Sequence, residues 1–144
     1  MIAKVFFDTN VIIDAITGRD SNYRDSQTLM VKAAKKEIKG YISSKQITDI
    51  YYILRKYTKD EAKKRAFIKL VSESFEILPL FPADVSYSLN SKIDDYEDAI
   101  LDEAAKVNCI PFFVTNDSEH FKNANSVVMN PHDFLTFIEN GNLA

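Results

Sequence analysis

The stretch KVFFDTNVII, residues 4–13, contains a short apolar segment that ends on a carboxylate. Val5, Phe6 and Phe7 are apolar on both faces, which is typical of a strand buried in the middle of a parallel sheet. Asp8 then breaks the apolar run, which resumes at Val11. A helix N-cap would explain this aspartate. A ligand site at the carboxyl end of a strand, where open α/β sheets bind their ligands, would explain it equally well.

The rest of the chain alternates between strand and helix patterns. We predict strands at 3–7, 41–44, 75–80, 110–115 and 126–130, and helices from near residue 10, at 21–38, at 45–57, from 60, from 82, at 97–107 and from 131. In the helix at 21–38 we expect Leu29, Val31, Ala33 and Ala34 to face the core, and we expect Gly40 to terminate it. Strands joined by helices imply a mainly parallel sheet with helices on both faces, so the fold class is α/β.

Composition limits the possible functions. The 144 residues are 46% hydrophobic and 27% charged, as expected for one globular domain spanning 1–144. Cys109 is the only cysteine, which excludes an internal disulfide and a thiolate cluster, and we expect it to be a core thiol. We find no membrane span and no signal peptide, so a cytoplasmic location is the expectation.

The net charge of −3 conceals an asymmetry along the chain. Residues 1–69 contain 15 of the 18 Lys and Arg against 8 Asp and Glu, and the later residues contain 3 against 13. Solvated helix faces would explain this pattern, and so would a phosphate-binding rim beside an acidic pocket.

A second aspartate repeats the pattern of Asp8. Asp117 follows the apolar run PFFVT and stands next to Thr115 and Asn116. Because neighbouring parallel strands end at the same edge of the sheet, both carboxylates are predicted to lie at that edge.

Two further groups of acids belong with this pair. Asp49 interrupts the apolar helix QITDIYYIL, where aspartate is a poor helix former. Asp95, Glu97 and Asp98 cluster at the start of the helix at 97–107, and three acids exceed what the helix dipole favours. Carboxylates gathered in one place repel each other and must be protonated or bind a cation. Oxygen ligands suit Mg²⁺ or Mn²⁺.

Four segments in this order, FFDTNVIID, SSKQITDIYYILRK, DDYEDAI and FFVTNDSEHF, resemble the successive motifs of the PIN domain family. More narrowly, they resemble the short bacterial PIN proteins that include toxin nucleases of the VapC type. The resemblance implies a PIN-like (Rossmann-like) three-layer α/β/α sandwich with a central, mainly parallel sheet of about five strands. It also implies cleavage of single-stranded RNA with a divalent metal, a small antitoxin partner and a homodimer.

Carried over by position, the acids of the family motifs fall on Asp8, Asp49, Asp98 and Asp117, with Asn10 and Thr115 as supporting residues. Two departures are visible. Asp49 replaces the usual Glu and is one methylene shorter, and His120 stands where an acid is common. Asp8, Asp98 and Asp117 would hold one or two Mg²⁺ or Mn²⁺ ions that activate a water, and Asp49 or Asp95 would orient that water or hold the second ion.

Basic side chains from residues 32–69, with Lys45, Arg55 and Lys56 as candidates, would hold the flanking RNA phosphates. Two other functions fit the same residues. One is a nucleic-acid-binding module with little turnover, because Asp49 is a shortened ligand. The other is a structural subunit whose acidic pocket binds a basic peptide.

Overall fold

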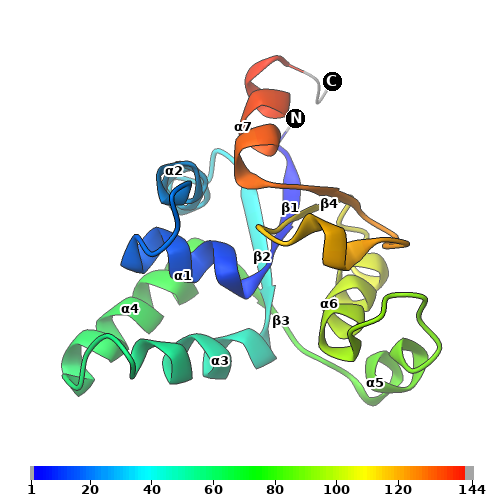
Figure 1. Cartoon of the computed structure of the whole chain (residues 1–144), viewed down its shortest axis with the longest axis horizontal. Coiled ribbons are helices and arrows are strands. Elements are labelled where there is room, and N and C mark those ends of the chain that lie inside the picture. The colour runs from blue at the N-terminus through cyan, green and yellow to red at the C-terminus, as the bar shows by residue number, and fades with distance from the viewer. Residues whose placement is uncertain (1, 142–144) are drawn as a thin grey trace.

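The structure is a computed structural model and describes residues 2–141. Its centre is a five-stranded sheet in the order β3-β2-β1-β4-β5, with every neighbouring pair parallel (Figure 1). The strands are β1 (Lys4–Phe7), β2 (Lys39–Ser43), β3 (Glu76–Leu78), β4 (Phe112–Val114) and β5 (Val127–Met129). The predicted sheet of about five strands is therefore confirmed, and β1 lies at its centre.

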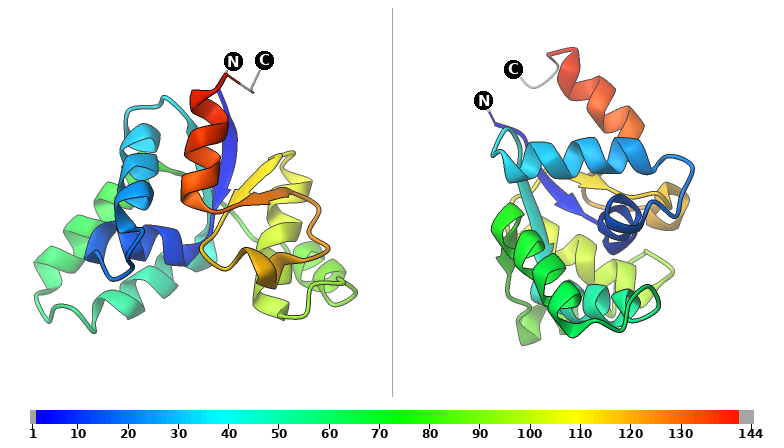
Figure 2. Two further views of the ribbon diagram at one scale, coloured as in Figure 1. Left: turned by 45° about the horizontal axis from the view of Figure 1, so that its top comes forward. Right: turned by 90° about the vertical axis from the view of Figure 1, so that its left-hand side faces the viewer.

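Helices cover both faces of this sheet, so the predicted α/β/α sandwich is confirmed. They are α1 (Thr9–Thr17), α2 (Tyr23–Ala34), α3 (Ser44–Leu54), α4 (Glu61–Ser74), α5 (Pro82–Ser88), α6 (Tyr96–Val107), α7 (Pro131–Glu139) and the 3₁₀ helix η1 (Ser118–Phe121). Figure 2 shows α1 to α4 on one side of the sheet and α5 and α6 on the other. Over residues 2–141, none of the helices has the length and apolarity needed to cross a membrane.

The central strand contributes side chains to two separate hydrophobic cores, because its side chains alternate between the faces of the sheet. Val5 and Phe7 join the core under α1, α2, α3, α4 and α7, whereas Phe6 joins the core under α6. Phe7 meets Phe75 edge to face with ring centroids 4.8 Å apart, and Phe6 stacks on Phe113 at 5.3 Å. Burial on both faces explains why the strand is apolar from Val5 to Phe7.

Helix α2 is shorter than predicted, and part of its predicted core face is wrong. It ends at Ala34, and its buried residues are Ser26, Leu29, Met30 and Ala33. Val31 is 50% exposed and Ala34 is exposed as well. The buried set follows the i, i+3, i+4, i+7 spacing of one helix face, and Val31 and Ala34 fall outside it.

Gly40 does not terminate this helix, contrary to the prediction. It lies inside β2, and the left-handed residue after α2 is Lys36, with φ of 63°. A Cβ at Gly40 would lie 2.7 Å from the ring of Phe75 and 3.3 Å from Cβ of Ala33. This glycine is therefore required by close packing between the sheet and the helices above it.

Cys109 is exposed, so the prediction of a core thiol is wrong. It lies in the turn between α6 and β4 with a positive φ of 57°. The neighbouring Ile110 takes the buried position instead.

We predict that Gly40→Ala lowers the free energy of unfolding by about 1 to 3 kcal/mol, because the new methyl group overlaps the Phe75 ring. Urea unfolding of both proteins measures the effect. The same substitution in a Phe75→Leu background should cost less, because the smaller side chain makes room. An equal cost in both backgrounds would show that the Phe75 ring is not the cause.

Candidate active site

The pairing of β1 with β4 places the first polar residue after each strand side by side. Phe7 is aligned with Val114, and the backbone N–H of Asp8 donates to the carbonyl oxygen of Val114 at 2.9 Å. The next residue of β4, Thr115, is fully buried and donates from Oγ1 to the carboxylate of Asp8 at 2.7 Å. Strand register thus sets the orientation of the Asp8 carboxylate.

Asp117 joins the same end of the sheet. Its backbone N–H donates to Oγ1 of Thr115 at 3.0 Å, so one hydroxyl contacts both segments. Its carboxylate accepts a hydrogen bond at 2.8 Å from the side-chain amide of Asn10, in the first turn of α1. Asn10 also accepts from the backbone N–H of Asn116 at 3.3 Å. The structure therefore brings together Asp8, Asn10, Thr115 and Asp117.

Asp95 and Asp98 lie at the start of α6 and serve different purposes. Asp95 is the N-cap residue and accepts the backbone N–H of Asp98 at 3.0 Å. Asp98 is half-buried and faces a cleft that it shares with Asp8. Asp95 is not among the residues that line this cleft, so it supports the site by fixing the first turn of α6.

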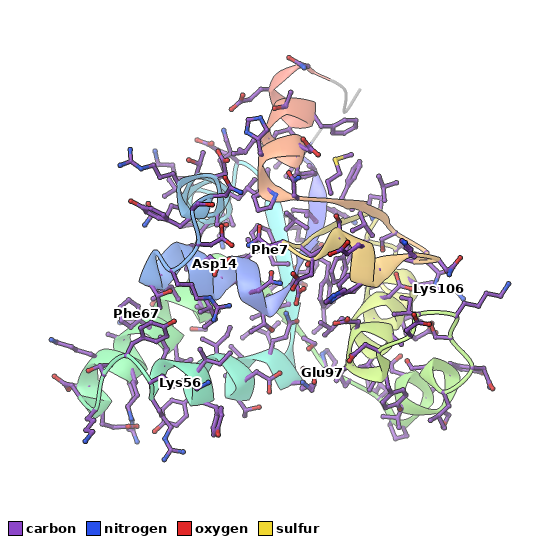
Figure 3. The ribbon with its side chains drawn as sticks, viewed as in Figure 1. Phe7, Asp14, Lys56, Phe67, Glu97 and Lys106 are labelled. Carbon is purple, nitrogen blue, oxygen red and sulfur yellow. The ribbon has the colours of Figure 1, made fainter. Side chains whose placement is uncertain are left out.

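The cleft has a volume of about 360 Å³ and opens at the carboxyl end of β1. Its polar lining includes Asp8, Asn10, Asp49, Glu97, Asp98 and Asp117. Glu97 lies where the first turns of α3 and α6 approach each other (Figure 3). All four acids predicted from the sequence therefore line one cleft, together with Glu97.

Lys45 is directed at two of these acids. Its Nζ lies 2.6 Å from Oδ2 of Asp49, one helical turn further along α3, and 2.8 Å from Oε1 of Glu97 on α6. Burial by itself would lower the pKa of Lys45, but the hydrogen bonds to Asp49 and Glu97 outweigh burial and raise it. The charge of this predicted phosphate ligand is thus already shared by two carboxylates.

The other two predicted phosphate ligands, Arg55 and Lys56, are exposed just beyond the end of α3. The Arg55 guanidinium lies 5.8 Å from the ring centroid of Tyr52. Tyr52 is 61% exposed and lines the cleft. An arginine and an aromatic ring therefore stand together at the rim of the acidic cleft.

Two acids of the site, Asp8 and Asp98, have raised pKa values. Burial raises the pKa of Asp8 to about 6; hydrogen bonds from Thr115 and the backbone of Thr9 oppose the rise, and the charges of Asp117 and Glu97 add to it. Burial, followed by the charge of Asp8, also raises the pKa of Asp98 to about 6. Carboxylates that repel one another in a partly dry cleft favour any cation that enters.

Sequence reasoning missed a pair of residues beside the cleft. Asp14 of α1 is buried and accepts hydrogen bonds from Arg19, at 2.6 Å, and from the side chain of Asn116. Arg19 reaches into the lining of the cleft. Asp14 interrupts the apolar helix VIIDAI as Asp49 interrupts its own helix, so the same signal was available. Figure 3 labels Asp14 in the middle of α1.

Among residues 2–141, no group of three or more His, Cys, Asp or Glu side chains stands close enough together to hold a metal ion. The acids of the cleft instead accept hydrogen bonds from Thr115, Asn10 and Lys45.

The fold is that of a PIN domain. The family description of the PIN domain matches residues 4–119, and the chain belongs to this family. It is 32% identical over 124 residues to Ribonuclease VapC1 of Aquifex aeolicus (strain VF5), and the alignment covers 82% of this chain and 84% of that protein.

Solved structures agree with this assignment at the level of the fold. PAE2754 from Pyrobaculum aerophilum matches with a TM-score of 0.68 and 16% identity, over 97% of this chain and 98% of that one. A chain of VapBC2 from Rickettsia felis, bound to a DNA fragment from its promoter, matches with a TM-score of 0.66 and 20% identity, over 90% of this chain and 98% of that one.

We predict that the metal-free protein loses stability as the pH rises from about 4 to above 6. The folded-state pKa of Asp8, about 6, exceeds the ordinary value of 3.8, so in this window the folded state binds more protons than the unfolded state. Asp8→Asn removes the part of this effect that Asp8 contributes and should be about 2 to 3 kcal/mol more stable than wild type at pH 7.5. At pH 3.5 this advantage should vanish. Urea midpoints in EDTA at both pH values measure it.

Glu139→Gln is the matched control, because Glu139 is exposed in the last turn of α7, away from the cleft. It should show no comparable change between the two pH values. If Asp8→Asn behaves like this control, the buried carboxylate does not carry the penalty.

Proposed function

We propose that this chain is an endoribonuclease that hydrolyses phosphodiester bonds of single-stranded RNA with Mg²⁺ or Mn²⁺. The observation that carries the proposal is that Asp8, Asp98 and Asp117, from three separate parts of the chain, face one cleft. The name of the Aquifex relative, Ribonuclease VapC1, supports the same activity.

The donor set of the cleft fits a hard divalent cation. Asp8, Asp98 and Asp117 supply oxygen ligands only, and burial, to which the charges of neighbouring acids add, raises the pKa values of Asp8 and Asp98. These three residues are the proposed metal ligands. A bound ion would supply Lewis acidity, lowering the pKa of a coordinated water and stabilising negative charge on the phosphate.

The remaining residues of the site have positioning roles in this proposal. Thr115 orients one oxygen of Asp8, and Asn10 orients Asp117. Asp49 keeps its second oxygen, Oδ1, for a hydrogen bond from the attacking water, because Lys45 binds Oδ2. Arg55 and Lys56, which are exposed just beyond the end of α3, would hold the flanking RNA phosphates.

A role as the toxin of a toxin–antitoxin pair belongs to the same proposal, with a small antitoxin protein as partner and a homodimer as the assembled form. One structural relative is the VapBC2 complex from Rickettsia felis, and another is a toxin–antitoxin complex from Klebsiella pneumoniae. A small gene directly upstream of the gene for this chain would support the role.

One observation favours a second candidate function, an RNA-binding module with slow turnover. Asp49 is shorter than the usual Glu, and one of its oxygens already binds Lys45. RNA affinity that falls with salt but yields no product would identify this function.

We predict that purified protein cleaves single-stranded RNA with Mg²⁺ or Mn²⁺ and that EDTA abolishes cleavage. Asp8→Asn should reduce the rate at least 100-fold, because an amide does not supply the charge that binds the ion. Glu139→Gln, prepared in the same way, should cleave like wild type. Equal cleavage by Asp8→Asn and wild type would mean that a contaminating nuclease or a different site is responsible.

A second expectation concerns metal-dependent stability. Mg²⁺ at ten times its Kd should stabilise wild type by about 1.4 kcal/mol, whereas Asp98→Asn should lose most of this gain. In EDTA the Asp98→Asn protein should be at least as stable as wild type, because a repelling charge has been removed. Urea midpoints with EDTA and with Mg²⁺ test both statements. If Asp98→Asn is less stable than wild type in EDTA yet keeps the full stabilisation by Mg²⁺, Asp98 stabilises the first turn of α6 and is not a metal ligand.

A further inference from the structure

The acidic cleft has two halves, and the partners of the carboxylates differ between them. In the first half, the carboxylates of Asp8 and Asp117 accept hydrogen bonds from the uncharged donors Thr115 and Asn10. In the second half, Asp49 and Glu97 both bind the ammonium of Lys45. Negative charge therefore has no cationic partner in the first half, whereas one ammonium offsets one of the two negative charges in the second.

The position of Lys45 is well defined by its surroundings. Its side chain is 31% exposed, and its partners come from two helices on opposite faces of the sheet, α3 and α6. Asp49 follows it by four residues, which places both side chains on one face of α3. The distance to Glu97 is in the range of strong charge-assisted hydrogen bonds, and the distance to Asp49 is slightly shorter.

We infer that Lys45 is a built-in cation that occupies the second cation position of the cleft, so that this chain takes one divalent ion. That ion binds at Asp8, Asp98 and Asp117, and the inference rests on the proposed function for the existence of this first position. A second divalent ion at Asp49 and Glu97 would stand within a few ångströms of the ammonium, whose charge repels it. Lys45 thus sets the metal stoichiometry and is a positioning residue for Asp49.

The arrangement also gives a reason for the short side chain at position 49. An aspartate at i+4 holds its carboxylate close to its own helix, within 2.6 Å of the Lys45 ammonium. The Lys45 ammonium, rather than a bound metal ion, then orients the Asp49 carboxylate. The predicted role of Lys45 as a phosphate ligand is replaced by an interaction within the site.

Counting bound Mn²⁺ tests the inference without reference to activity. Electron paramagnetic resonance reports free Mn²⁺, so a titration of the protein gives the number of ions bound per chain. We expect one for wild type, two for Lys45→Met, and one for Lys45→Arg, which keeps the cation. Lys69→Met is the matched control, because Lys69 also pairs with an acid four residues later, Glu73, but on the exposed face of α4. It should bind one ion.

Two further variants make the result specific to Asp49. The double variant Lys45→Met with Asp49→Asn should return to one ion, because the second position has lost a ligand. Asp49→Asn alone should also bind one ion with wild-type affinity, and it tests the inference even if Lys45→Met does not fold.

The possible outcomes separate this inference from the proposed function. Two ions on wild type, or one ion on folded Lys45→Met, would overturn the inference and leave the ribonuclease proposal standing. Loss of the ion in Asp49→Asn would also overturn the inference, because Asp49 would then be a ligand of the first position. No ion on wild type would refute the metal site itself and with it the proposed mechanism.

Discussion

The carboxylate of Asp8 is the group on which the rest of the site depends. It is 9% exposed and directly follows a strand whose last three side chains are fully buried. Placing an ionised carboxylate there has a large desolvation cost unless hydrogen bonds and charges compensate it. The hydroxyl of Thr115 reaches Asp8 because Phe7 is aligned with Val114. A shift of one residue in this register would remove the donor and turn the side chains of β4 to the opposite faces.

A second contact connects the end of β1 to the helix that carries Asp49. The buried side chain of Gln46 donates to the carbonyl oxygen of Phe7 at 2.7 Å and accepts the backbone N–H of Ser43 at 2.7 Å. The first turn of α3 is thereby fixed to the strand that ends in Asp8. Asp49 and Lys45 consequently keep a defined position relative to Asp8, although they are about forty residues apart in the chain.

The sequence predicted those features that depend on local pattern and on the general geometry of parallel sheets. The strands and the placement of Asp8 and Asp117 at one edge of the sheet follow from apolar runs that end on acids, whereas Asp49 and Asp98 join them through the resemblance to the family motifs. It did not predict contacts that depend on which distant side chains meet. Gly40 is small because Phe75 lies above it, and Lys45 reaches an acid fifty-two residues away. Pattern alone also failed within α2, where Val31 continues an apolar run in the sequence but is exposed.

The different partners of the acids have a common electrostatic reason. A lysine beside Asp8 would lower its pKa and stabilise the fold, but it would also cancel the charge that attracts a divalent ion. Uncharged donors such as Thr115 and Asn10 orient the carboxylates and leave their negative charge in place. Lys45 instead binds at the more exposed side of the cleft, where Asp49 and Glu97 would otherwise add to the repulsion. Stability is therefore gained where it does not compete with cation binding, and the cost of clustered charge remains concentrated on Asp8 and Asp98.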